Sequence, residues 1–267
     1  MDLKQIRYCR ECRVSHHLKI KNVKNSFLEN PANVRGMNTR SLRVLEDYAH
    51  KNVIKNEESV VRLTRMATEI AVEWKPGRVI HVSFIGGNKT VKERLIRHAN
   101  RWMNYANIVF DFADRKKAGD IRIAFRDDGS WSEMGTAALS TPKNEPTMNF
   151  GWLTPRLDDE EYSRVVLHEF GHALGFIHEH ERPDNGIPWD KSKVYEYYAE
   201  SDGWTPEEVD SQVFSYYDRN LIRASKVDRK SIMMYAVPNE LTKGNYQIGW
   251  NTDFSPADKK FIAKVYP

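Results

Sequence analysis

Apolar side chains recur at helical spacing in two stretches of the first third of the chain, Ser41–Tyr48 and Glu57–Trp74. In the longer stretch they form a one-sided stripe, and Lys75-Pro76-Gly77 is typical of the end of a helix. Residues 1–40 are polar and basic without such a period, so we expect them to be irregular. The pattern therefore predicts a mostly helical N-terminal extension over residues 1–75.

A different pattern follows this extension. Arg78–Ile85 alternates and is β-branched, which predicts a strand, and Thr90–Tyr105 has the period of an amphipathic helix. Glu160–Leu174 predicts a strong helix, and Ser255-Pro256-Ala257-Asp258 has the N-cap, proline and acidic residue that begin a last helix. The shorter strands are expected at Ile108–Phe112, Asp120–Phe125, Gly135–Leu139 and Thr147–Leu153. This order predicts an α+β fold, a twisted mixed sheet with helices packed on it.

Composition limits the class of protein. The 267 residues are 40% hydrophobic and 29% charged, which fits one large domain, or one domain with an extension. The formal charge is only +4 and the basic residues are scattered, so we expect no nucleic-acid partner. The oligomeric state is unknown, with a monomer favoured. We also expect no membrane span and see no secretory signal. The location stays open between the cytoplasm, export by a non-classical route, and secretion of a chain whose signal has been removed.

Three histidines and a glutamate lie at fixed spacing between His168 and His178. His168 and His172 are four residues apart on the predicted helix, so both imidazoles can reach one ion. Zinc takes imidazole nitrogens in tetrahedral geometry, and a catalytic site keeps the fourth position for water. Gly175 can end the helix in a left-handed turn and bring His178 back as third ligand. Glu169 then lies where the water sits, the place for a general base.

The string His-Glu-x-x-His-x-x-Gly-x-x-His is the metzincin signature, and this part of the chain resembles that family of zinc peptidases. Ser231-Ile232-Met233-Met234-Tyr235 is similar to the family's Met-turn, which implies Met233, rather than Met234, as the floor beneath the metal. His178 through Asp184 resembles the astacin continuation. Tyr235 matches a tyrosine that in astacins and serralysins can bind zinc and then stabilise the oxyanion.

The resemblance implies a metzincin-like catalytic domain at residues 76–267, with an active-site helix and a C-terminal helix. It implies one catalytic zinc ion and a zinc-dependent endopeptidase that cuts internal bonds of extended protein or peptide substrates, with Glu169 activating the attacking water. In resembling families Glu179 binds the N-terminus freed by processing; a buried acidic partner for a cation or backbone donors is the alternative. Substrate is expected to pair with an edge strand. That strand is placed at Gly135, Thr136, Ala137, Ala138 and Leu139.

Several features depart from the astacin pattern or stay open. The catalytic region has none of the four cysteines usual in astacins, and the segment from Gly129 to Thr136 is more similar to matrixins. Cys9 and Cys12 could form a small zinc site with neighbouring histidines, a disulfide or a thiolate plug on the catalytic zinc, or have no function. Residues 1–75 would be propeptide-like or regulatory. Calcium stays undecided.

A zinc-containing binding module without catalysis is the competing interpretation of the same motif. Glu169 argues against it, because a structural zinc site needs no base and closes its fourth position with a protein ligand. His180 is interpreted as polar surface or as a residue behind the ligands, since it is one position too far to replace His178.

Overall fold

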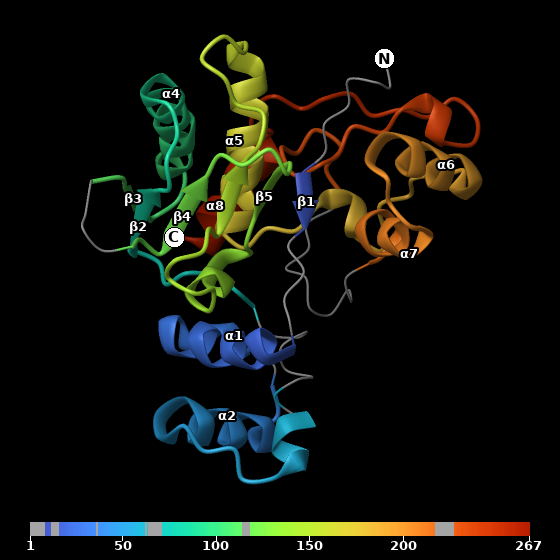
Figure 1. The fold of residues 1–267 in the computed structure, drawn as a ribbon. Helices are drawn as coiled ribbons and strands as arrows, with labels where there is room; N and C mark the ends of the chain where they lie inside the picture. Colours follow the sequence, from blue (N-terminus) through green and yellow to red (C-terminus); the bar gives the residue numbers. More distant parts are fainter. Residues whose placement is uncertain are drawn as a thin grey trace.

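A six-stranded sheet in the order β1-β5-β6-β4-β2-β3 carries the main core in this computed structural model (Figure 1). The structure describes residues 9–11, 16–35, 37–61, 63, 71–113, 118–216 and 227–267. Strands β3, β2, β4 and β6 are parallel, β5 is antiparallel to β6, and β1 is parallel to β5. The strands are β1 (Cys9–Glu11), β2 (Val79–Phe84), β3 (Val109–Asp111), β4 (Ile121–Ala124), β5 (Ser130–Ser132) and β6 (Met148–Phe150). The sheet is thus mixed, as the sequence predicted.

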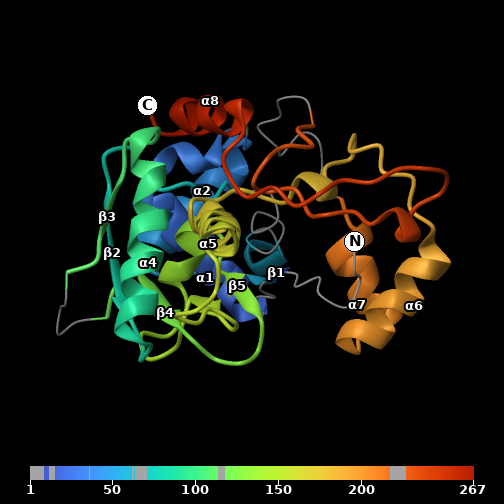
Figure 2. The ribbon, with the colours of Figure 1, turned by 90° about the horizontal axis from the view of Figure 1, so that it is seen from above.

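Two helices, α4 (Lys89–Ala99) and α5 (Asp159–Ala173), lie side by side against this sheet (Figure 2). Alternation along β2 buries Ile80 and Val82, and the facing side of α5 is buried along almost its whole length. After α4 the chain continues as the short 3-10 helix η3 (Asn100–Asn104), so the helix predicted to Tyr105 has a tighter end. Helix α5 is therefore buried on all sides from Tyr162 to Ala173.

The last helix, α8 (Pro256–Val265), begins where the sequence predicted. Ser255 and Asp258 form a reciprocal capping box, and Pro256 occupies the first position. Beyond the helix, the Tyr266 hydroxyl donates to the carbonyl of Leu174 at 2.7 Å, at the end of α5. The same oxygen accepts the backbone N–H of Trp74 at 3.1 Å. The C-terminal segment therefore closes the core at the base of α5.

A second apolar cluster lies beside the main core, around α6 (Lys191–Asp202), α7 (Pro206–Val209) and the π-helical turn η6 (Asp210–Phe214). Tyr198 and Trp204 stack there with ring centroids 4.7 Å apart. These elements lie on the side of α5 away from α4 (Figure 2). The remaining short 3-10 turns are η2 (Pro31–Val34), η4 (Gly135–Leu139), η5 (Glu179–Glu181) and η7 (Asn239–Leu241).

The expectation that residues 1–40 are irregular is wrong, because α1 spans His16–Glu29. Its buried residues Ile20 and Val23 pack with Leu45 of α2 (Thr39–Lys51) in a small separate cluster. The apolar face of α1 is too sparse to be visible as a stripe in the sequence. Its helical state is stabilised by partners elsewhere in the chain.

The helix predicted to Trp74 ends earlier, since residues 71–75 are not helical. Part of that prediction, residues 64–70, lies outside the described residues. Trp74 is fully buried against α5, and its indole Nε1 donates to the carbonyl of Ala173 at 2.7 Å. A buried Trp needs a partner for its N–H, and this hydrogen bond holds the segment against the end of α5.

The edge strand expected at Gly135–Leu139 is also wrong, because these residues form η4. Gly135 has φ +46, and a Cβ there would overlap the carbonyl oxygen of Val72. That oxygen accepts the Thr136 N–H at 2.9 Å, and the Thr136 hydroxyl contacts Ser26 of α1. Contacts with distant segments therefore fold this stretch into a turn, and the strands on that side of the sheet are β5 and, outside it, β1. Among the described residues, no helix is both long and apolar enough to cross a membrane.

Candidate active site

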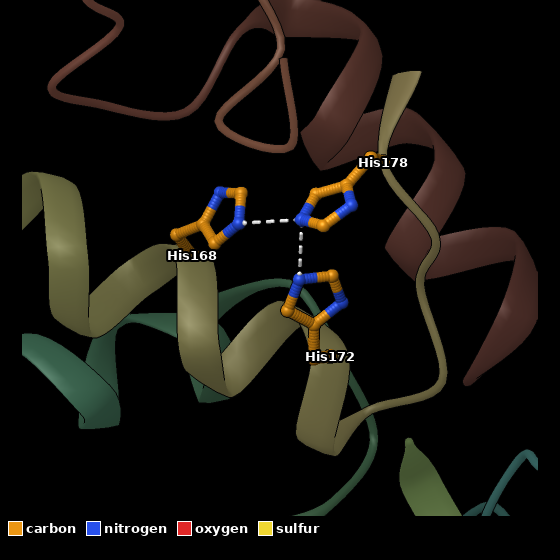
Figure 3. Close-up of side chains that lie close together, drawn as sticks. All are labelled: His168, His172 and His178. Atoms are coloured by element: carbon orange, nitrogen blue, oxygen red, sulfur yellow. Dashed lines mark hydrogen bonds between the residues drawn. The ribbon is translucent and has the colours of Figure 1, made fainter. Parts of the chain in front are cut away.

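Three histidine side chains converge at the end of α5. His168 and His172 project from the helix, and His178 follows the turn at Gly175 (Figure 3). The His178 Nε2 lies 2.9 Å from the His172 Nε2 and 3.1 Å from the His168 Nε2. Gly175 has φ +92, in the left-handed region that favours glycine. The structure thus brings together the three residues expected as ligands, through the turn expected at Gly175.

The other nitrogen of each ring, Nδ1, is within hydrogen-bonding distance of an acceptor that faces away from the cluster. These acceptors are the Ile232 carbonyl at 2.8 Å for His168, the Phe176 carbonyl at 2.7 Å for His172 and the Glu181 carboxylate at 3.1 Å for His178. Donation to these acceptors puts the proton on Nδ1 and leaves the Nε2 lone pair of each ring facing the centre.

The cluster is buried and uncharged, which suits a metal. Burial lowers the pKa of His172 to about 4 and the pKa of His168 and His178 well below the usual range. A tetrahedral zinc ion about 2.0–2.1 Å from each nitrogen needs nitrogen–nitrogen separations of roughly 3.3 Å. The observed separations are close to this, so the three neutral imidazoles fit one zinc ion.

Glu169 and Met233 are both buried near the histidine cluster. Glu169 is fully buried in α5, directly after the first histidine. The sulfur of Met233 packs against Gly171 so closely that a Cβ at Gly171 would overlap it. Met234 belongs to a different apolar cluster, with Ile187. Met233 therefore packs directly against α5, and its role as the floor beneath the metal stays a prediction.

Tyr235 lies beside the histidine cluster and is almost fully buried. Its ring centroid is 4.4 Å from that of His178 and 6.0 Å from that of His168. On another side it stacks on His180 at 4.3 Å, and the His180 Nε2 is 3.1 Å from the carbonyl of Gln212 in η6. The interpretation of His180 as surface is therefore wrong, because its ring is fully buried behind Tyr235.

Glu179 points away from the histidines. Its carboxylate accepts the Asp228 N–H at 3.1 Å and lies 3.6 Å from the Arg182 guanidinium. Burial raises the pKa of Glu179 to about 7. These contacts are those of the second interpretation, an acid beside a cation and a backbone donor. Binding of a processed N-terminus stays a prediction.

Strand β5 lies near α5, between β6 and the edge strand β1. Strand β1 lies beside β5 (Figure 1). In their parallel register Cys9 is opposite Ser130 and Glu11 is opposite Ser132. Cys12 lies outside the described residues, so the roles weighed for the cysteines stay predictions. Among the described residues, two groups of side chains could hold a metal. One is the histidine cluster and the other combines His178, His180 and Glu181.

Sequence reasoning missed two contacts at the site, and the first is that of the Glu181 carboxylate with His178. The spacing of three residues between them is compatible with contact in a turn, but nothing in the sequence shows the turn η5 that provides it. No sequence pattern indicated the His180–Tyr235 stack either. Both depend on how the chain folds after Gly175.

Comparison with known proteins agrees with this geometry. The model of the astacin family of peptidases matches residues 66–267. The zinc metalloproteinase dpy-31 of Teladorsagia circumcincta is 27% identical over 227 residues, 81% of this chain and 34% of that protein. The dpy-31 of Caenorhabditis elegans is 29% identical over 203 residues, 72% of this chain and 32% of that protein. The chain thus spans about a third of the length of these curated relatives.

Solved structures of myroilysin are also similar to this chain. One is 45% identical with a TM-score of 0.71, covering 73% of this chain and 96% of the myroilysin chain. A second is 45% identical with a TM-score of 0.59, covering 73% of this chain and 86% of the other. The likeness therefore extends over nearly all of the first myroilysin chain.

Proposed function

The chain belongs to the astacin family of peptidases, and from this membership we propose that it is a zinc-dependent endopeptidase cutting internal bonds of extended protein or peptide substrates. The observation that carries the proposal is the convergence of three neutral imidazole nitrogens beside a buried glutamate. His168, His172 and His178 would hold the ion. A purely structural zinc site would have no use for Glu169.

When bound, zinc supplies a Lewis acid that polarises the substrate carbonyl and lowers the pKa of water. Glu169 takes a proton from the attacking water as the oxygen–carbon bond forms. It then delivers that proton to the leaving amine as the carbon–nitrogen bond breaks. Its position on the rigid helix α5 keeps the carboxylate next to the ligands during both transfers.

Tyr235 is proposed to donate its phenol O–H to the negative charge that develops on the carbonyl oxygen. Its ring packs against both His178 and His180, which keeps it beside the reacting centre. A positioned donor in a buried site stabilises such charge more strongly than water does. The contact with His180 limits the freedom of the ring without using its hydroxyl.

Residues 1–75 are proposed to act as a propeptide-like segment that keeps substrate away. Extended substrates bind sheet edges through main-chain hydrogen bonds. The parallel pairing of β1 with β5 supports the proposal, because it uses the edge that a substrate would need. Displacement or cleavage of the segment would then be required before substrate can bind.

The test is digestion of casein and of a peptide library, with and without a zinc chelator, by the full chain and by a form lacking residues 1–15. We expect internal cleavage that the chelator abolishes and added zinc restores, fastest in the shortened form. Stoichiometric zinc binding without cleavage in either form would favour the binding-module interpretation instead.

A further inference from the structure

The three histidines differ in the group that accepts the hydrogen bond from Nδ1. His168 and His172 each donate Nδ1–H to a neutral backbone carbonyl, whereas His178 donates to the side-chain carboxylate of Glu181. Both side chains of the His178–Glu181 pair are only 1% exposed. A carboxylate in such a buried place normally has a specific partner, because its desolvation is costly.

The turn that carries Glu181 is held by hydrogen bonds to backbone carbonyls, which do not involve the imidazole rings. The Glu181 N–H donates to the carbonyl of His178 at 3.3 Å, which closes η5 and brings the carboxylate back over the imidazole. The amide of the buried Asn185 donates to the carbonyls of His180 at 2.6 Å and Arg182 at 2.8 Å. The carboxylate is therefore held by backbone geometry as well as by its contact with His178.

We propose that Glu181 is a positioning residue for the metal: it orients His178 through Nδ1 and makes its Nε2 a stronger zinc ligand. The inference rests on the proposed zinc site. An anionic acceptor withdraws the Nδ1 proton toward itself, which increases electron density on Nε2. His178 follows a glycine turn and lacks the support of a helix, so it is the ligand that most needs this constraint.

A metal bound by His178, His180 and Glu181 themselves is the competing explanation. The Nε2 of His178 lies 2.9 and 3.1 Å from the Nε2 atoms of His172 and His168, so this nitrogen already faces the histidine cluster. The Glu181 oxygen is at hydrogen-bonding distance from His178 Nδ1, and His180 Nε2 faces the Gln212 carbonyl. The observations favour a hydrogen-bonded carboxylate behind one metal site.

The test compares the full chain with its Glu181→Gln variant, which keeps an acceptor oxygen but removes the charge. Glu196→Gln, the same change at an exposed site on α6, is the matched control. Zinc affinity is measured by competition with a chromogenic chelator, zinc release by stopped flow, and zinc content by elemental analysis. We expect one zinc per chain, with affinity about 10–100-fold weaker in Glu181→Gln only and correspondingly faster release.

Wild-type zinc affinity and release rate in Glu181→Gln would overturn the proposal. So would two zinc ions per chain with one lost in the variant, since Glu181 would then be a ligand. Where Glu181→Gln does not fold, Glu181→Asp replaces it with the same expected direction, because the shorter side chain moves away from Nδ1. These readouts are independent of cleavage, so a wild-type chain that binds zinc but cuts nothing contradicts the proposed function alone.

Discussion

Two buried glutamates near the same three histidines have different tasks. Glu169 follows His168 on α5 and is proposed to move protons, whereas Glu181 contacts the far nitrogen of His178 and is proposed to hold the ligand. Their chemical group is identical, so their positions decide what each can do. Substitutions at the two residues should therefore affect different measurements.

Replacing Glu169 should separate metal binding from turnover. Glu169→Gln keeps the shape of the side chain but cannot accept a proton, so we expect normal zinc content and a kcat lower by roughly 10²–10⁴-fold. Peptide cleavage assays with zinc quantified in the same samples measure both quantities. Normal digestion by the variant would contradict the role as base.

Tyr235 should contribute to rate more than to binding. Tyr235→Phe removes one donor to the oxyanion and keeps the ring that stacks on His180, so kcat should fall about 10²-fold or more with KM little changed. Steady-state kinetics measure the two constants, and a thermal melt checks that the fold is intact. An unchanged kcat would remove Tyr235 from this role.

At the scale of elements, the Met-turn (Ser231–Tyr235) and α8 form one unit that supports α5. Asp258 accepts the Ser231 hydroxyl at 2.7 Å and the Ile232 N–H at 2.9 Å. The Ile232 carbonyl in turn accepts the Nδ1–H of His168. One carboxylate at the start of α8 thus fixes the loop on which a ligand depends.

Loss of this carboxylate should destabilise the protein more than loss of the cap alone. Asp258→Ala breaks both the capping box and the bonds to the Met-turn, and we expect it to lower the free energy of unfolding by about 2–4 kcal/mol. Ser255→Ala breaks the cap and should cost about 1 kcal/mol. Urea unfolding of the two variants gives the comparison; equal losses would show that the Met-turn contacts contribute nothing.

Glu133, which follows β5, should make stability depend on pH. Burial raises its pKa from the usual 4.5 to about 7, against the opposing effects of the Thr141 hydrogen bond and the Arg122 charge. Between pH 4.5 and 7 the unfolded chain ionises this group before the folded chain does, so its contribution to stability falls as pH rises through this window. We expect Glu133→Gln to gain roughly 1–3 kcal/mol relative to wild type between pH 5 and pH 8, measured by chemical unfolding.

A constant difference in stability between wild type and Glu133→Gln across that pH range would contradict the buried position of the Glu133 carboxyl. The comparison between two proteins at each pH cancels the effects of other titrating groups and of zinc binding.

Elements with strong local signals were predictable from the sequence, and those fixed by distant contacts were not. The period of α5, the capping box of α8 and the histidine spacing are encoded within a few residues each. The turn at Gly135 depends on Val72, and the helical state of α1 depends on its packing with α2. The contact of Glu181 with His178 depends on a turn that no local pattern shows.

At the scale of the whole molecule, the N-terminal segment is proposed to compete with substrate for the side of β5 that β1 occupies. α1 is anchored on the domain at the turn η4, where Lys21 donates to the Ser140 carbonyl at 2.9 Å and Asn25 to the Ser140 hydroxyl at 3.0 Å. Strand β1 precedes α1 in the chain, so it can be removed without removing this anchor.

Deletion of residues 1–15 should therefore free β5 and leave the rest of the fold in place. We expect faster cleavage of long peptides, at least several-fold, with unchanged zinc affinity. Cleavage rates and zinc competition on the two forms measure this. Equal rates would show that β1 does not hinder substrate, and weaker zinc binding would show that the deletion disturbs the metal site.

The hydrogen bond from Tyr266 to Leu174 also has a consequence for biosynthesis. During synthesis the histidine motif leaves the ribosome long before Tyr266 does. The Leu174 carbonyl at the end of α5 and the Trp74 N–H can therefore bond to the Tyr266 hydroxyl only after Tyr266 has also emerged. We therefore expect nascent chains that stop before this residue to hold an incompletely closed core.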